Sequence, residues 1–120
     1  MPSQLSNEVL MDVEAVGISD THYSSSMDFR RCAGNAALFI ISSAGLITVS
    51  QQCSWDNKIW HDPVDLVGSS LGVVRALLSV TSGIYVPFTP VMSAYIRFKV
   101  VEGGTAGTSV TLRIIYRVET

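Results

Sequence analysis

Four side chains that could bind a metal ion lie close together in one stretch of this sequence. They are Asp56, His61, Asp62 and Asp65. A hard cation such as Ca²⁺ takes about six to eight oxygen ligands, and the spacing here matches no metal-binding loop motif. The competing interpretation is that the acids cap turns, because short Asx side chains bond to nearby backbone groups. We therefore expect no metal ion and no other cofactor here.

Nucleophilic catalysis by a cysteine that a histidine base activates is the second kind of chemistry to consider. His22 lies in a polar segment and could activate Cys32 or Cys53 if an acid oriented it. Nothing in the local sequence supports such a pair, and Cys53 alternates onto a half-buried strand face. The two cysteines could form one disulfide, but two free, mostly buried thiols in a reducing compartment are the better interpretation. We expect that the protein is not an enzyme.

Basic and aromatic side chains indicate binding instead of catalysis. Four basic residues would form a stripe on one sheet face if their two strands pair, and would otherwise belong to an ordinary solvated face: Arg97, Lys99, Arg113 and Arg117. Three aromatic residues could stack on sugar rings or anchor a protein interface if they are exposed: Tyr23, Trp55 and Tyr85.

The overall composition narrows the class of protein. A chain of 120 residues forms one domain, and 48% hydrophobic against 15% charged residues exceeds what a small soluble monomer usually needs, so we expect apolar surface against partners. The net charge of −2 argues against nucleic-acid binding by phosphate neutralisation. No segment approaches the ~20 apolar residues of a membrane span, and no secretory signal is visible. We expect cytosolic synthesis, with no membrane or nucleic-acid partner.

The stretch from Leu46 to Pro63 is predicted to be a hairpin around which the chain is organised. Its first strand runs to about Ser54, Asp56-Asn57 supplies turn chemistry, and Trp60 begins the return. One face of the first strand is partly apolar and consists of Ile47, Val49, Gln51 and Cys53.

Several other segments alternate with the period of two expected of strands. The segment Leu66–Val80 fits a helix as well as a strand, but Gly68 and Gly72 weaken a helix, so we favour a strand from about Gly72 to Val80. Pro87 belongs at an edge or a bulge. The predicted strands are Ala36–Ser42, Gly72–Val80, Ile84–Thr89, Ser93–Val101 and Ser109–Val118. In the clearest alternation, the core-facing residues are Ala94, Ile96, Phe98 and Val100. These strands predict an all-β fold, an antiparallel β-sandwich or jelly roll.

Residues 1–27 show no sustained period and are predicted to form an extended N-terminal arm, followed by a β-sandwich domain of residues 28–120. The arm is acidic. Residues 1–29 contain five acidic and no basic residues, which gives −5, whereas residues 30–120 contain eight basic and five acidic residues, which gives +3. We expect the order of the arm to depend on the surface against which it lies, with a solvated tail as the alternative for residues 1–7.

Two short motifs resemble virion proteins of tailed bacteriophages, which often share a β-sandwich built around a Ser-x-Asp-Gly-x-x-Trp hairpin. The matching residues are Ser54, Asp56 and Trp60, and Asn57 stands where glycine is usual. A later strand of that family with a Tyr-Ile-Arg pattern is similar to residues 93–100. The resemblance implies a structural protein without catalytic residues, located in the virion after synthesis in the host cytoplasm. Capsid decoration is the role it favours, and a tail or connector component is next.

The expected partners follow from that role. We predict a homo-oligomer, with a trimer favoured, that docks on a major capsid protein or another virion protein. The arm residues Leu5 to Val16 would lie on the shell or on an adjacent subunit. The predicted interface residues are Leu5, Val9, Leu10, Val13, Tyr23, Trp55, Tyr85, Arg97 and Arg113. The runner-up is a carbohydrate-binding β-sandwich module, which predicts that Trp55 or Trp60 is exposed.

Overall fold

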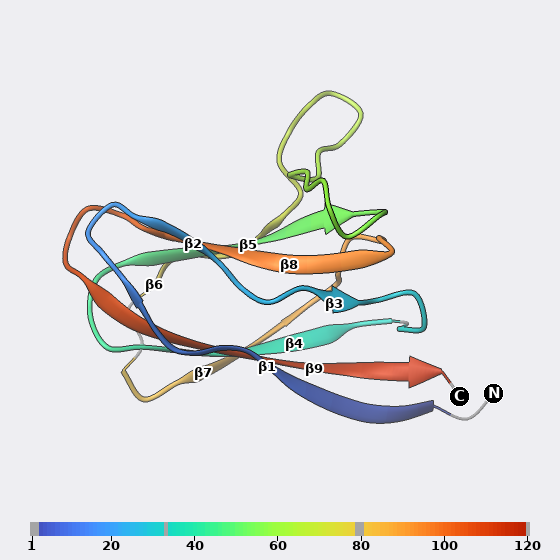
Figure 1. Cartoon of the computed structure of the whole chain (residues 1–120), viewed down its shortest axis with the longest axis horizontal. Helices are drawn as coiled ribbons and strands as arrows, with labels where there is room; N and C mark the ends of the chain where they lie inside the picture. Colours follow the sequence, from blue (N-terminus) through green and yellow to red (C-terminus); the bar gives the residue numbers. More distant parts are fainter. Residues whose placement is uncertain (1–2, 33, 79–80, 120) are drawn as a thin grey trace.

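The chain folds into two antiparallel β-sheets that pack face to face (Figure 1). The computed structural model describes residues 3–32, 34–78 and 81–119. Sheet A has the strand order β1 (Ser3–Val16), β9 (Thr108–Glu119), β4 (Ala36–Ser42) and β7 (Ile84–Phe88). Sheet B has the order β2 (Thr21–Tyr23), β8 (Tyr95–Glu102), β5 (Ile47–Ser54) and β6 (Val73–Leu78), and β3 (Met27–Asp28) also pairs with β8. The all-β sandwich predicted from the sequence is confirmed. Over the described residues, no helix is long and apolar enough to cross a membrane.

The core lies between the sheets and is built from alternate residues of the central strands. Ile96, Phe98 and Val100 of β8 are fully buried, as their alternation predicts. Facing them from β9 are Val110, Leu112 and Ile114. The ring of Phe98 meets Phe88 edge to face at 5.9 Å. Burying each such side chain stabilises the fold by about 1.5–3 kcal/mol, so these strands hold the two sheets together.

The predicted hairpin is present, with a shorter return than expected. In β5, Ile47 and Val49 are buried on the predicted face. Asn57 adopts a φ of 62°, a left-handed conformation that Asn tolerates. Beyond the turn, the backbones of Cys53 and His61 exchange two hydrogen bonds of 2.9 Å, and this isolated bridge replaces the expected second strand.

The ambiguous segment 66–80 contains a strand in its described part. Residues 73–78 form β6, which pairs with β5, whereas residues 79 and 80 lie outside the described residues. A side chain at Gly72 would meet the Gln51 carbonyl oxygen at 2.7 Å, so glycine permits this close approach. Gln51 also fixes the chain before β8, because its amide donates to the Val91 carbonyl at 2.9 Å and accepts from the Val91 N–H at 3.0 Å.

Most of the predicted arm belongs to the sandwich over its described residues. Residues 3–16 form β1, which pairs with β9 from Ser3 opposite Glu119 to Val16 opposite Thr108. The register shifts twice along the strand, between Val9 and Met11 and between Met11 and Glu14. Three β1 side chains are buried in the core: Leu10, Met11 and Val16. Residues 3–16 of the segment expected as an arm are thus an edge strand of sheet A, and residues 21–23 and 27–28 pair with β8 in sheet B.

Candidate interaction surfaces

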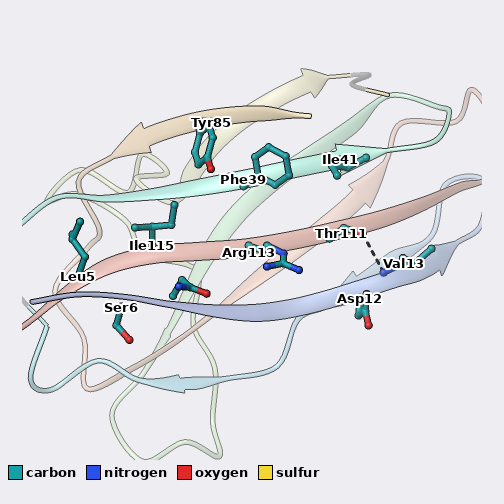
Figure 2. Close-up of a pocket in the computed structure, with 11 residues that line it drawn as sticks. Leu5, Ser6, Asp12, Val13, Phe39, Ile41, Tyr85, Thr111, Arg113 and Ile115 are labelled. Atoms are coloured by element: carbon teal, nitrogen blue, oxygen red, sulfur yellow. Dashed lines mark hydrogen bonds between the residues drawn. The ribbon is translucent and has the colours of Figure 1, made fainter. Parts of the chain in front are cut away.

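An open groove of about 750 Å³ lies on the outer face of sheet A (Figure 2). All four strands of the sheet contribute side chains that point away from the core. The lining residues are Leu5, Ser6, Asn7, Asp12 and Val13 of β1, Phe39 and Ile41 of β4, Tyr85 of β7, and Thr111, Arg113 and Ile115 of β9. The strand order brings these residues together, because β9 and β4 lie between β1 and β7.

The groove exposes apolar side chains on a face that would be polar if it met only water, because six of its eleven lining residues are aliphatic or aromatic. The rings of Phe39 and Tyr85 contact each other with centroids 5.0 Å apart. Leu5, Val13 and Tyr85 are 67%, 66% and 65% exposed. The outer face of an antiparallel sheet is normally polar when it meets water, and a contiguous exposed apolar patch marks an interaction surface. The groove is therefore a candidate surface for a partner.

The edge of the groove contains an unusual backbone conformation. Val13 has a φ of 49°, which is a genuine outlier for a β-branched residue. It lies at the second register shift of β1, and its N–H donates to the Thr111 hydroxyl oxygen at 3.2 Å (Figure 2). This conformation exposes the Val13 side chain at the rim of the groove.

The structure gathers four of the nine predicted interface residues in this groove: Leu5, Val13, Tyr85 and Arg113. Val9 is exposed on β1 directly across from Arg113. Leu10 is different, because its side chain is buried in the core of its own chain. Sequence reasoning missed Phe39, Ile41 and Ile115, although the apolar outward positions in Ala36–Ser42 were the available signal.

Arg97 lies on the outer face of sheet B, between two aromatic rings. Its guanidinium is 4.1 Å from the centroid of Tyr23 and 4.6 Å from that of Trp60. The Arg97 Nε donates to the Gln52 side-chain oxygen at 2.8 Å, and burial lowers the pKa of Arg97. Gln52 in turn donates to Asp62 at 3.0 Å. One face of the Trp60 ring is thus covered by Arg97 of the same chain. The Trp55 side chain, by contrast, is 81% exposed.

The basic stripe that would result from pairing of the two strands does not form. Strands β8 and β9 lie in different sheets, so Arg97 and Lys99 are on sheet B, whereas Arg113 and Arg117 are on sheet A. The stripe required these two strands to pair, but the glycine-rich loop after Glu102 carries the chain from one sheet to the other.

The loop of residues 55–72 projects from sheet B, on the side away from sheet A (Figure 1). Asp65 organises its end, because one carboxylate oxygen accepts from the N–H groups of Val67 and Ser69, each at 2.9 Å. The Asp65 N–H also donates to the Ser69 carbonyl at 2.9 Å. This turn presents an apolar tip, in which Leu66 is fully exposed and Val67 is 86% exposed. Sequence reasoning did not single out this tip.

The acids of the loop have roles in the fold itself. Asp56 accepts from the N–H groups of Lys58 and Ile59 at 2.9 and 3.0 Å, and the Ile59 hydrogen bond is the first cause of its lowered pKa. The hydrogen bond from Gln52 likewise lowers the pKa of Asp62. Among the described residues, no group of three His, Cys, Asp or Glu side chains is placed to hold a metal ion.

The possible nucleophiles are half-buried thiols. Cys32 and Cys53 are free, and burial raises the pKa of each. A raised pKa disfavours the thiolate, which is the nucleophilic form. The partner that the structure gives His22 is Glu14, with 3.3 Å between the ring nitrogen and a carboxylate oxygen.

No protein-family model and no curated protein matches the chain. Solved structures of viral particles do match. The infectious bursal disease virus VP2 subviral particle aligns with a TM-score of 0.55 and 11% identity over 98% of this chain and 33% of that chain. T=1 particles derived from infectious bursal virus give 0.52 and 12% over 98% and 32%, and the Gx strain of infectious bursal disease virus gives 0.51 and 11% over 97% and 32%. The chain therefore shares the fold of these β-sandwich units and spans about a third of the chains it matches.

Proposed function

We propose that this chain is a structural protein of a virus particle, which works through contacts with its own copies and with other shell proteins. The observation that carries the proposal is the groove on the outer face of sheet A with its exposed apolar side chains, which favour contact with a protein partner. The fold likeness to chains of viral particles supports the same class.

The order of the strands adds support. The order β1-β9-β4-β7 in one sheet and β2-β8-β5-β6 in the other makes the chain cross repeatedly between the sheets. We infer that the sandwich is a jelly roll, with β3 as a short addition beside β2. Jelly rolls of eight strands in two sheets are used by viral capsid domains and by lectins.

The specific role that we propose is capsid decoration as a homo-oligomer. The Ser54, Asp56 and Trp60 hairpin motif supports a tailed-bacteriophage origin, while the matching solved structures come from infectious bursal disease virus. In this role the chain sits on a shell of the major capsid protein, and a trimer is the favoured assembly. A tail or connector component is the next possibility within the same class.

Immunogold electron microscopy would test the proposal. Antibodies raised against the recombinant chain are applied to particles produced by the viral genome that encodes it. We expect gold label spread over the shell. Label confined to the tail or to one vertex would support the tail or connector role. Particles without label, beside labelled infected-cell lysate, would contradict a virion role altogether.

A carbohydrate-binding module is the second candidate, and the exposure of Trp55 favours it specifically. An exposed indole can stack on a sugar ring, whereas Trp60 is covered by Arg97. Titration of the chain with a panel of glycans, with tryptophan fluorescence as the readout, separates the two functions. For a structural virion protein we expect no saturable change. A saturable change that is lost in Trp55→Leu would favour the binding module instead.

A further inference from the structure

The tip of the 55–72 loop has the properties of an anchor for another molecule. Leu66 is fully exposed and Val67 is 86% exposed, although both are apolar. The turn beneath them is fixed by hydrogen bonds, including Gly68 N–H to the Asp65 carbonyl at 3.1 Å and Leu71 N–H to the Pro63 carbonyl at 2.9 Å. Because the turn is preorganised, little conformational entropy would be lost on docking. A fixed apolar protrusion of this kind is suited to filling a pocket.

The sheet A groove has the matching properties. Its volume of about 750 Å³ lies within the range of about 300–1,000 Å³ that holds compact apolar groups. Phe39, Ile41 and Ile115 lie along it, and the exposed side chains of Leu5 and Tyr85 flank it (Figure 2). Its volume is therefore large enough for two aliphatic side chains, which would contact these apolar residues.

Charge complementarity points the same way. Asp65 immediately precedes the tip and is exposed, and one of its carboxylate oxygens holds the turn. Arg113 projects into the groove and is also exposed, whereas Asp12, the one carboxylate among the lining residues, lies on the edge strand β1 (Figure 2). A carboxylate beside the inserted tip and a guanidinium in the receiving groove would steer the two surfaces together and help to fix their orientation.

The tip of one molecule cannot reach its own groove. The loop projects from sheet B, and the groove lies on the opposite outer face of the sandwich (Figure 1). A second copy can supply the missing half. The contact would join two different surfaces, and such head-to-tail contacts build rings when the rotation closes and filaments when it does not.

We propose that the Leu66–Val67 tip of one copy inserts into the sheet A groove of a second copy, with Asp65 approaching Arg113. This contact rests on the proposed function, to which it adds the surfaces used for self-association. It explains why both an apolar protrusion and an apolar recess are exposed in one chain.

Sedimentation velocity of the full chain over a concentration series tests the contact. The tip variant is Leu66→Asp, and the groove variants are Tyr85→Asp and Leu5→Asp, all at exposed positions. Met92→Asp is the matched control, because Met92 is 96% exposed and lies outside both surfaces. We expect each tip or groove variant to associate at least about tenfold more weakly, the loss of one buried anchor, and the control to match the wild type. Two groove variants keep the test valid if one of them fails to fold.

Mixing the variants is the decisive step. Leu66→Asp keeps an intact groove, and Tyr85→Asp keeps an intact tip, so an equimolar mixture should form heterodimers and nothing larger. A mixture that stays monomeric while the wild type associates would overturn the proposal. A wild type that remains monomeric up to about 1 mM would also overturn it. As a further check, the wild type and Leu66→Asp are each mixed with neutral lipid vesicles. If Leu66→Asp loses binding to the vesicles but keeps self-association, the tip binds lipid and the proposal is overturned.

The outcome can be separated from that of the proposed function. A chain that is monomeric in solution but labels the shell in the immunogold experiment refutes the contact and leaves the virion role intact. If the chain associates through tip and groove but no gold label is found on particles, the contact is supported and the virion role is refuted.

Discussion

Glu102 shows how one buried side chain can join segments that are distant in the sequence. It lies at the end of β8 and is 1% exposed. One carboxylate oxygen accepts from the N–H groups of Ser19 at 3.1 Å and Gly104 at 2.6 Å, and the other accepts from Leu46 N–H at 3.1 Å. The turn after β1, the start of β5 and the loop before β9 are thereby held at one point. Burial alone would raise the pKa of Glu102, but the backbone hydrogen bonds from Ser19, Leu46, Thr105 and Gly104 outweigh it and lower the pKa to about 2.

The pH dependence of stability should follow from this carboxylate. Its pKa falls from an ordinary 4.5 to about 2 in the folded chain, so its stabilising effect is complete above pH 4.5 and is lost as the pH falls towards 2. We expect Glu102→Gln to lower the free energy of unfolding at pH 7 and to reduce the loss of stability between pH 4.5 and 2. Urea denaturation across this pH range measures both effects.

The control for this substitution is Glu119→Gln, because Glu119 is exposed near the end of β9. It should leave the stability at pH 7 and its dependence on pH close to those of the wild type. If Glu102→Gln and the wild type lose stability equally between pH 4.5 and 2, the carboxylate is not the group responsible.

At the scale of elements, β1 is a structural strand of the sandwich and not an arm attached to it. Leu10, Met11 and Val16 are buried, and at about 1.5–3 kcal/mol for each buried side chain their loss would approach the whole stability of a typical domain, about 5–15 kcal/mol. Deletion of residues 1–16 would also uncover the β9 edge, which invites aggregation.

We therefore expect the deletion variant to lose cooperative unfolding and to aggregate, as circular dichroism and size exclusion would show. Addition of a synthetic peptide of residues 1–16 should restore the fold, since a donated strand can complete an exposed sheet edge. A deletion variant that unfolds cooperatively without the peptide would mean that residues 3–16 are dispensable to the sandwich.

The contrast between β1 and β8 explains what the sequence can and cannot predict. The buried residues of β8 alternate regularly, so the residues that face the core can be predicted from the sequence. In β1 the register shift makes two consecutive residues, Leu10 and Met11, both face the core, and this removes the period of two on which prediction depends. Bulges are set by the pairing with β9, and a single strand carries no sign of them.

The groove was only partly predictable, for a different reason. The run Ala36–Ser42 is apolar on both faces, and such a run predicts a strand buried on both sides. In the structure Leu38 and Ile40 face the core, while Phe39 and Ile41 line the groove. The sequence therefore indicates that the second face should be covered, but only the pairing of β1, β9, β4 and β7 shows which residues share it.

At the scale of the whole molecule, the two outer faces of the sandwich differ in chemistry. The outer face of sheet A has an apolar groove, whereas sheet B carries the Tyr23, Arg97 and Trp60 stack with its hydrogen-bonded Gln52. Because the two faces differ, the molecule has a defined orientation, and an assembly in which one face binds the other keeps that orientation from copy to copy. Copies joined by the tip and the groove would all point the same way around a ring or along a filament.

The pairing of β1 with β9 also decides where this sandwich can be joined to other polypeptide. Ser3 lies opposite Glu119, so the two ends of the described chain emerge at one corner, away from the 55–72 loop (Figure 1). A unit with adjacent ends can be spliced into a loop of a host domain, or have its ends linked and reopened elsewhere, without a connection that spans the molecule. A displayed peptide attached at this corner would leave the loop tip uncovered.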